Sequence, residues 1–301
     1  MCGGYCHPAY VQALAEFGAP RPLPGCGGWI LERPIPGDAT GDAIGPYPLF
    51  TCADWSALPQ DLEQLRTSLV CVALVADPLA EVSETHLRRC FDRVIHFKDH
   101  YVVECDAPPQ MSKHHRYYAR KALERVRVER CEEPRLLLAR WVELYEHLVK
   151  RHRLRGIKAF SRQSFARQFE VPGLVMLTAR AGDELVGAHL WFVSGPAAYS
   201  HLMALNDAGY ALNASYALYL KAIEEAAHWF GGAVRRLGLG SAAGLAGDPT
   251  DGLALFKRGW TNRSVPAFFC GRVLDPNQYA RLSAPFGPTD YFPAYRKGEF
   301  A

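Results

Sequence analysis

The stretch LVMLTARAGDELVGAHLWFVSGPAAYSHLMAL, residues 174–205, decides the fold of the larger part of this chain. It contains three apolar runs, at 174–180, 185–193 and 197–205, which are separated by the turn sequences AGDE and SGP. Glycine beside aspartate or proline favours a tight turn between two strands. The stretch therefore predicts three antiparallel strands joined as a meander.

Helical patterns flank this meander on both sides in the sequence. Residues 134–152 repeat apolar side chains at three- and four-residue steps, which is the stripe of an amphipathic helix. Shorter helices are predicted over 161–169, where Ser161 is suited to be the N-cap, and over 214–230. The basic stretch 112–130 is rich in Ala, Leu, Arg and Lys, so its middle is predicted to be helical as well. Two further strands are predicted at 234–239 and 265–273.

The first third of the chain has a different character. Residues 18–54 contain seven prolines, which favour short strands and turns over long helices. Residues 68–75 form an apolar run that predicts a buried strand. The other elements predicted here are a strand at 28–33, a helix at 82–92 and a strand pair at 93–97 and 101–105. We therefore expect an α/β (α+β) protein with two domains, 1–109 and 110–301, divided near Pro108-Pro109.

Composition limits the function classes that need to be considered. Hydrophobic residues make up 49% and charged residues 22%, which is typical of a globular protein whose core needs no metal or disulfide. The net charge of +3 does not by itself indicate nucleic acid. The nine cysteines are irregularly spaced, which predicts reduced thiols and no zinc site. The start of the chain has no leader pattern and no apolar run reaches membrane-spanning length, so we expect a cytoplasmic protein without a membrane span.

Three segments carry more specific information. They are HRYYARKAL at 115–123, NDAGYALNASYALY at 206–219, and DGLALFKRGW at 251–260. In this order they resemble the FemAB-like branch of the GNAT acyltransferase superfamily over about residues 110–265. That branch combines an Arg-rich helix, a strand–loop–helix with Gly-Tyr and Ser-Tyr-Ala-Leu, and a Phe-Lys-x-Gly-aromatic turn.

The resemblance implies a fold and a reaction. The fold would be two GNAT-like lobes with mixed, mainly antiparallel sheets flanked by helices, the second lobe being the more complete. The reaction would be acyl transfer from a thioester or an aminoacyl-tRNA ester to an amine. Such a transfer passes through a tetrahedral oxyanion and needs a donor against that charge, but it needs no covalent enzyme intermediate. The sequence also lacks a Gly-x-Ser-x-Gly elbow, which argues against a serine hydrolase of that type.

Three residues are predicted to be catalytic. Lys257 lies between Phe256 and Trp260, and the resemblance implies a role beside the donor ester or phosphate. The alternative is a solvated surface lysine. Tyr199 and His201 alternate along one predicted strand and are expected to face the same side, where His201 would accept the amine proton because an imidazole titrates near neutrality. The alternative for His201 is packing in the core.

The segment before the helix at 214–230 is predicted to bind the donor. A helix start offers free N–H groups that favour a phosphate or carboxylate, and the residues assigned to this role are Asn206, Tyr210, Ser215 and Tyr216. The Arg/Gln-x-x-Gly-x-Gly/Ala pattern with which acetyl-CoA users bind pyrophosphate is missing from this segment, which counts against acetyl-CoA. Ordinary helix capping is the alternative.

Cations and an N-terminal loop supply the remaining candidates. Arg116, Arg120 and Lys121 share one helical side and would bind donor or acceptor phosphates, including a tRNA backbone. The alternative is a solvated helix face. In the rigid loop DAIGPYP, Asp42 and Tyr47 would shape the acceptor pocket, although turn architecture also explains them.

Three functions remain open at this point. The first is an aminoacyltransferase that uses aminoacyl-tRNA, slightly favoured by the basic helix. The second is an acyl-CoA-dependent N-acetyltransferase, and the third is a non-catalytic ligand-binding protein on a decayed GNAT scaffold. For either enzyme we expect no bound metal and no permanently bound cofactor, because the donor is a co-substrate. The partners would be a small-molecule or peptide amine acceptor and, in the first case, tRNA.

Overall fold

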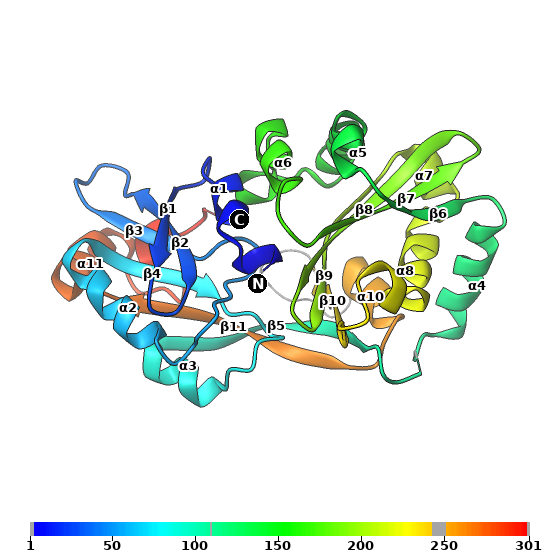
Figure 1. The fold of residues 1–301 in the computed structure, drawn as a ribbon. Helices are drawn as coiled ribbons and strands as arrows, with labels where there is room; N and C mark the ends of the chain where they lie inside the picture. Colours follow the sequence, from blue (N-terminus) through cyan, green and yellow to red (C-terminus); the bar gives the residue numbers. More distant parts are fainter. Residues whose placement is uncertain (1–2, 109, 243–250, 300–301) are drawn as a thin grey trace. The chain divides into compact units, whose positions relative to one another are not determined.

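The structure of the protein is a computed structural model that describes residues 3–108, 110–242 and 251–299 (Figure 1). The chain divides into two units, and each is described by itself. Unit 1 consists of Met1–Gly4 and Asp99–Val265, and unit 2 consists of Tyr5–Lys98 and Pro266–Ala301. The chain passes between the units within β5 (Arg93–Glu104), within β11 (Ser264–Val273) and in the short 3-10 helix η1 (Gly4–Cys6).

Unit 1 is built on a sheet in the order β5-β10-β9-β8-β7-β6. The predicted meander is confirmed, because β7 pairs antiparallel with β8 and β8 pairs antiparallel with β9. Its strands are β6 (Arg127–Cys131), β7 (Leu174–Ala181), β8 (Glu184–Ser194), β9 (Ala197–Leu205) and β10 (Arg236–Gly240). The apolar runs at 174–180, 185–193 and 197–205 therefore coincide with the strands to within one residue at each end.

Helices cover both faces of this sheet (Figure 1). One face carries α5 and α6, and Ser161 caps α6 as predicted by accepting from Ser164 N. The opposite face carries α4, α8 and α10, and its core includes Ala119, Leu218 and Trp260. The helical elements of unit 1 are α4 (Lys113–Leu123), η3 (Pro134–Leu137), α5 (Leu138–His152), η4 (Gly156–Lys158), α6 (Arg162–Gln168), α7 (Asp207–Ala211), α8 (Ala214–Glu224), α9 (Ala226–Trp229) and α10 (Gly252–Arg258).

The pairing of β9 with β10 is short, and this positions the candidate site. The two strands run parallel and pair from Arg236 opposite Ala197 to Gly238 opposite Tyr199. Beyond that point β10 ends at Gly240, whereas β9 continues to Leu205. After Tyr199, β9 therefore no longer pairs with β10, and residues 200–203 are all partly exposed.

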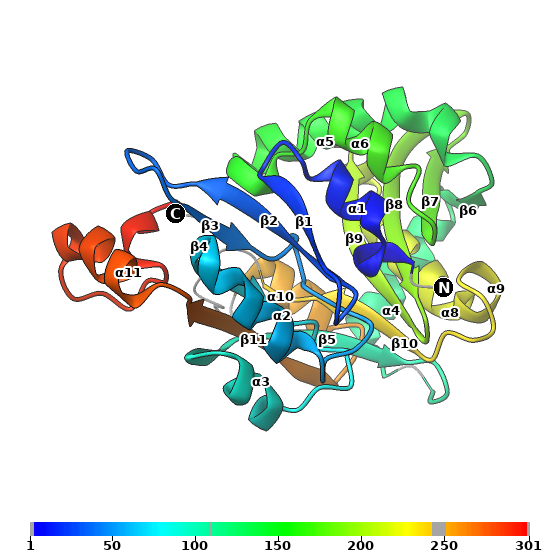
Figure 2. The same cartoon turned by 60° about the vertical axis from the view of Figure 1, so that its left-hand side comes forward.

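Unit 2 contains a sheet in the order β1-β2-β3-β4-β11. Figure 2 shows α2 across these strands, and the core between them contains Leu58, Leu62, Val72 and Leu87. The elements of unit 2 are α1 (Pro8–Ala13), β1 (Ala19–Leu23), β2 (Gly28–Pro34), β3 (Gly41–Ile44), α2 (Leu58–Gln64), η2 (Leu65–Thr67), β4 (Leu69–Val75), α3 (Glu84–Cys90), α11 (Pro276–Ser283), η5 (Ala284–Phe286) and η6 (Ala294–Arg296).

The α/β (α+β) class with mainly antiparallel sheets flanked by helices is confirmed. Two local predictions are wrong. The strand pair at 93–105 is one strand, because the polar residues between its two apolar runs stay extended. The helix at 214–230 is broken at Glu225 into α8 and α9. The sequence predicts two continuous domains, 1–109 and 110–301, whereas each unit of the structure is discontinuous in sequence. Residues 266–301 join unit 2 because β11 pairs with β4.

Two smaller findings concern the cysteines and the membrane. Cys6 is disulfide-bonded, against the expectation of reduced thiols throughout, whereas seven other described cysteines are free. Across the described residues, every helix is too short or too polar to span a bilayer.

Candidate active site

Lys257 lies on a helix rather than in the turn that the sequence predicts. Asp251 caps α10 by accepting from Leu253 N at 3.0 Å and from Ala254 N at 3.1 Å. Lys257 is in the last turn, and its Nζ donates to the carbonyl of Ser241 at 2.8 Å. A Cβ on Gly240 would lie 2.9 Å from that Nζ, so a glycine at the end of β10 leaves room for the ammonium group.

Aromatic rings surround the part of α10 that carries Lys257. The ring centroid of Phe256 lies 5.0 Å from that of Tyr216 and 5.1 Å from that of Tyr219. Trp260 stacks on Tyr219 at 5.8 Å with an interplanar angle of 13°. Lys257 is therefore a partly buried ammonium group beside an aromatic wall from α8 and α10, in agreement with the apolar flanks expected from the sequence.

A buried polar network lies on the same side of the sheet. His189 of β8 is fully buried, and its Nε2 lies 2.8 Å from Ser200 Oγ. Ser200 Oγ lies 3.0 Å from the hydroxyl of Tyr219. Burial holds the pKa of His189 well below its usual range, and electrostatic interactions with Lys257 and His201 lower it further. Burial raises the pKa of Tyr219 to about 12, although the hydrogen bond with Ser200 limits this rise. All three groups are therefore neutral at pH 7.

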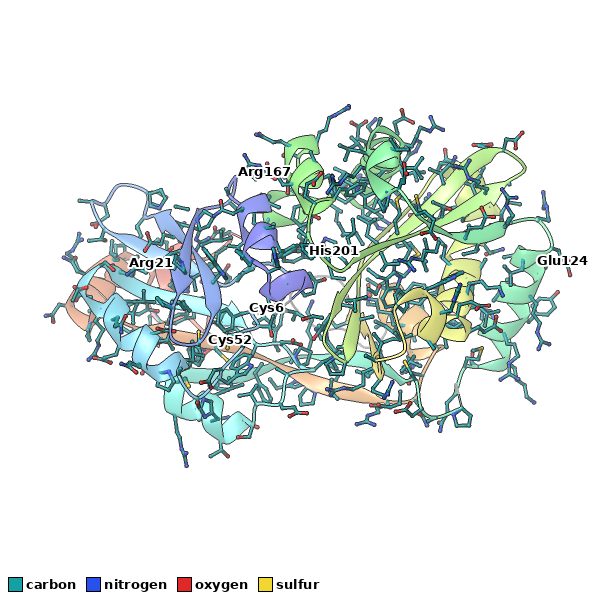
Figure 3. All side chains as sticks on the ribbon, in the orientation of Figure 1. Cys6, Arg21, Cys52, Glu124, Arg167 and His201 are labelled. Atoms are coloured by element: carbon teal, nitrogen blue, oxygen red, sulfur yellow. The ribbon has the colours of Figure 1, made fainter. Side chains whose placement is uncertain are left out.

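The position of His201 follows from an irregularity in β9. In the register of β8 and β9, Ser200 lies opposite Trp191 and Leu202 lies opposite Leu190. His201 is therefore an extra residue of β9, with no residue of β8 directly across from it. Its Nε2 lies 3.0 Å from Gln168 Oε1 of α6, and desolvation lowers its pKa to about 3. Figure 3 labels His201. The expected alternation of Tyr199 and His201 toward one site is thus interrupted, and Ser200 is the residue that faces α8 and the neighbourhood of Lys257.

Tyr199 lies at the last position where β9 pairs with β10, opposite Gly238, and its side chain is only 8% exposed. Tyr216 lies against α10, which carries Lys257. Its ring contacts Phe256 of α10 and, at 5.1 Å between centroids, His115 of α4. Ser215 is in the first turn of α8, which begins after Asn213 without a side-chain cap.

Asn206 and Tyr210 follow the carboxyl end of β9 at Leu205, whereas the ammonium group of Lys257 bonds the chain just after Gly240 of β10. Asn206 caps α7 by accepting from Gly209 N at 2.8 Å, and its amide donates to Glu184 Oε1 at 2.9 Å. The ring of Tyr210 packs under Arg151, 4.1 Å from the guanidinium carbon. Both residues thus have local contacts that account for their positions, and the structure does not group them with Lys257.

The predicted cations lie together on the outer face of α4. Arg116, Arg120 and Lys121 line an open groove with Lys113, Tyr117 and Glu124, and Figure 3 labels Glu124 at the end of this helix. All four cations are exposed, and none of them forms an ion pair within the described ranges of the chain. The opposite side of α4 buries His115, Ala119 and Ala122. Lys257 is not among the residues that line this groove.

Asp42 and Tyr47 lie in unit 2. Asp42 is fully buried and accepts from Arg33 at 3.3 Å, from Tyr295 at 3.1 Å and from Arg296 at 2.6 and 3.0 Å. The Tyr47 carbonyl accepts from the Tyr10 hydroxyl, and burial raises the pKa of Tyr47. Three residues thus donate four hydrogen bonds to the carboxylate of Asp42, and this network accounts for its burial.

Sequence reasoning missed the hydrogen-bonded group of His189, Ser200 and Tyr219, and it also missed His115, which bonds the carbonyl of Phe256. His189, Ser200 and Tyr219 lie on two strands and a helix that carry mostly apolar residues, so a single polar side chain in each gives a weak signal. A search for polar residues inside the apolar runs would have found His189 and Ser200, but not their contact.

Comparison with known proteins agrees with this geometry. Residues 110–243 match the family model described as an acetyltransferase (GNAT) domain. No curated protein matches the chain. Among solved structures, the C-terminal domain of an Agrobacterium fabrum protein described as a lysylphosphatidylglycerol synthetase is similar, with a TM-score of 0.64 and 12% identity over 90% of this chain and 88% of that one.

Two further structures have the same fold. FemX has a TM-score of 0.60 at 13% identity, over 84% of this chain and 86% of that chain. L-PGS from Bacillus licheniformis has a TM-score of 0.59 at 12% identity, over 90% of this chain and 93% of that chain. The family model thus identifies a GNAT acyltransferase domain within residues 110–243, and these solved structures share the fold of the chain.

Proposed function

We propose that this acyltransferase moves an aminoacyl group from aminoacyl-tRNA to the amine of a small molecule or peptide. The observation that carries the proposal is the outer face of α4, where exposed Lys113, Arg116, Arg120 and Lys121 have no acidic ion-pair partner in the described chain. Unpaired cations on one helix face suit a phosphodiester backbone. One protein of similar fold is described as a lysylphosphatidylglycerol synthetase, and the product in that name carries an amino acid.

In this proposal the amine attacks the ester carbonyl directly and forms a tetrahedral intermediate. The C–N bond forms and the ester C–O bond breaks, the amine loses a proton, and the leaving ribose oxygen gains one. The ammonium group of Lys257 lies beside an aromatic wall, where a charge is screened less than in water, and would stabilise the developing negative charge or the nearby phosphate. Arg116, Arg120 and Lys121 would hold the donor backbone, and Tyr216 and Ser215 would lie next to its reactive end.

An acyl-CoA donor is the second candidate, and one observation favours it. Helix α8 has eleven residues and starts after Asn213, which has a left-handed backbone and provides no side-chain cap. The N–H of Tyr216 donates to the Asn213 carbonyl at 3.0 Å, so the N–H groups of Ala214 and Ser215 are the ones that an anion such as a pyrophosphate would use. The missing glycine-rich pattern before this helix counts against that donor.

The test compares donors and one substitution. We expect charged tRNA, added at about 100 times its Kd, to stabilise the protein by about 2.7 kcal/mol, and acetyl-CoA to give a smaller shift. This stabilisation should weaken steeply between about 50 and 200 mM salt, because backbone contacts release counterions. Thermal melting with charged tRNA, uncharged tRNA and acetyl-CoA measures both effects.

Lys257→Ala should fold normally and lose at least about 100-fold in the rate at which labelled amino acid leaves tRNA for a panel of amine acceptors. Lys297→Ala, an exposed lysine of unit 2, is the matched control and should be unchanged. If acetyl-CoA raises the melting temperature more than charged tRNA does, the result would reject aminoacyl-tRNA as the donor and favour acyl-CoA. Binding of a donor without turnover on any acceptor would support the non-catalytic alternative.

A further inference from the structure

We propose that His115 is a positioning residue that holds the end of α10 in place, so that the ammonium group of Lys257 stays at the Gly240–Ser241 end of β10. This inference rests on the proposed function, because it matters only if Lys257 acts in the transfer. His115 opens the Arg-rich motif and Gly259 belongs to the Phe-Lys-x-Gly-aromatic motif, and the structure joins the two motifs at one contact.

Hydrogen bonds fix the imidazole in a single state. Its Nε2 lies 2.8 Å from the carbonyl of Phe256, which can only accept, so Nε2 carries the proton. Its Nδ1 lies 2.9 Å from Ser112 Oγ. Burial lowers the pKa of His115, so the ring is neutral and Nδ1 accepts from the Ser112 hydroxyl. The same Ser112 caps α4, because its Oγ accepts from His115 N at 3.1 Å.

The contact with Gly259 explains why a glycine is needed in the motif. A Cβ built on Gly259 would lie 1.9 Å from Cε1 of His115 and 2.2 Å from each ring nitrogen, so no other residue fits without displacing the ring. The backbone of Gly259 has φ −69°, which any residue adopts. Close approach of the imidazole, and not an unusual backbone angle, therefore requires the glycine.

These contacts hold the chain on both sides of Lys257. His115 binds the carbonyl of the residue before the lysine, and its ring rests against Gly259, two residues after it. The N–H of Ser112 also donates to the Gly259 carbonyl at 2.8 Å. Because Lys257 lies within a single helical turn between these points, its side chain leaves the backbone in a direction that His115 determines.

Aromatic rings prevent the imidazole from turning away. The ring centroid of His115 lies 5.0 Å from that of Trp260, 5.1 Å from that of Tyr216 and 5.5 Å from that of Phe256. An imidazole enclosed in this way keeps one rotamer, which is what a positioning residue requires.

The test measures the environment of Lys257 without any substrate. In the ligand-free protein, Lys257 is labelled by reductive methylation, and mass spectrometry compares its rate with that of exposed Lys297. We expect His115→Ala to raise the relative labelling rate of Lys257 by at least about threefold, because the end of α10 is released. His115→Gln retains an N–H donor and should stay within about a factor of two of the native rate.

Two glycine variants of the same helix form a matched pair. Gly259→Ala should resemble His115→Ala, whereas Gly252→Ala, at an open position on α10, should leave the labelling of Lys257 unchanged. His147→Ala, at an exposed histidine of α5, controls for loss of an imidazole. Unchanged labelling of Lys257 in folded His115→Ala and Gly259→Ala proteins would overturn the proposal. If His115→Ala does not fold, Gly259→Ala and Ser112→Ala decide the question by the same criterion.

The outcome separates this inference from the proposed function. Altered labelling together with an active Lys257→Ala variant would keep the positioning role and reject the role of Lys257 in transfer. Where transfer is measurable, His115→Ala should lower kcat by at least about tenfold with little change in the KM for the donor, and His115→Gln should restore most of it. If His115 only supported the fold in general, kcat would fall equally in His115→Ala and His115→Gln, and that result would count against a positioning role.

Discussion

Units 1 and 2 each bury a group of hydrogen-bonded polar side chains, and the two groups are built differently. In unit 2, the carboxylate of Asp42 accepts hydrogen bonds from Arg33, Tyr295 and Arg296, so its charge is balanced. In unit 1, His189 and Ser200 connect to Tyr219 through neutral groups, and Nδ1 of His189 has no hydrogen-bond partner among the residues that the structure describes.

The difference indicates what each group is for. A buried ion-pair network in which every charge is matched serves structure, because removing one member leaves the others buried and unpaired. A buried polar atom without a partner costs stability and is uncommon in folded proteins. In unit 1 this cost falls on His189, whose pKa is lowered by burial and in part by Lys257, and a shifted pKa beside a charged partner marks a candidate functional site.

Breaking the unit 2 network should have the largest effect on stability. Asp42→Asn keeps the shape of the side chain but removes the negative charge that Arg33 and Arg296 share. We expect a loss of about 3–5 kcal/mol in the free energy of unfolding, measured by urea denaturation. Asp290→Asn, whose carboxylate is fully exposed, is the control and should change stability by less than about 0.5 kcal/mol. A loss below about 1 kcal/mol for Asp42→Asn would show that the network is not structural.

Breaking the unit 1 network should have a smaller effect on stability. Ser200→Ala removes the partner of both His189 and Tyr219, and we expect a loss of about 1–3 kcal/mol in urea denaturation. It should also raise the pKa of Tyr219 further, since the hydrogen bond with Ser200 lowers that pKa. Exposed Ser264→Ala is the matched control. A loss as large as that of Asp42→Asn would remove the distinction between the two groups.

The smallest effect, taken per unit of pH, is the change in folding stability with pH that a histidine of unit 1 contributes. Burial lowers the pKa of His201 to about 3, below the value of about 6.5 in an unfolded chain. Below pH 6.5 the unfolded chain therefore binds a proton that the folded protein does not, so stability is complete above that pH and falls toward pH 3. We expect this histidine to contribute on the order of 1 kcal/mol per pH unit between about pH 6 and 4.

His201→Gln should flatten this part of the stability profile, which urea denaturation at several pH values would measure. His147→Gln, at an exposed position, is the control and should leave the slope unchanged. If His201 bound a proton as readily in the folded protein as in the unfolded chain, the free energy of unfolding would have the same slope against pH in the native protein and in His201→Gln.

Much of the fold could be predicted because it depends on local patterns. The turn sequences AGDE and SGP separate the three strands of the meander, and Ser161 caps α6. Asp251 was not predicted as a cap, and its two hydrogen bonds make the segment around Lys257 a helix instead of a turn. The family resemblance rested on three short motifs, and the family model matches residues 110–243.

The candidate site was less predictable because its contacts join residues far apart in the chain. Strand alternation predicts Tyr199 and His201 on the same side of the sheet. A single extra residue in β9 interrupts this alternation, so that Ser200 and not His201 faces α8. Such an irregularity depends on the partner strand and leaves no mark on the alternation of β9 itself.

The sequence by itself determined the order of strands and helices, the basic side of α4 and the lysine next to an aromatic pair, because period, turn chemistry and helical spacing act over a few residues. Only the tertiary structure decided that His115 meets Gly259, that Ser200 meets His189, and that residues 266–301 join unit 2. Each of these depends on which distant surfaces pack together, and packing is selected by the complementarity of whole elements rather than by neighbouring residues.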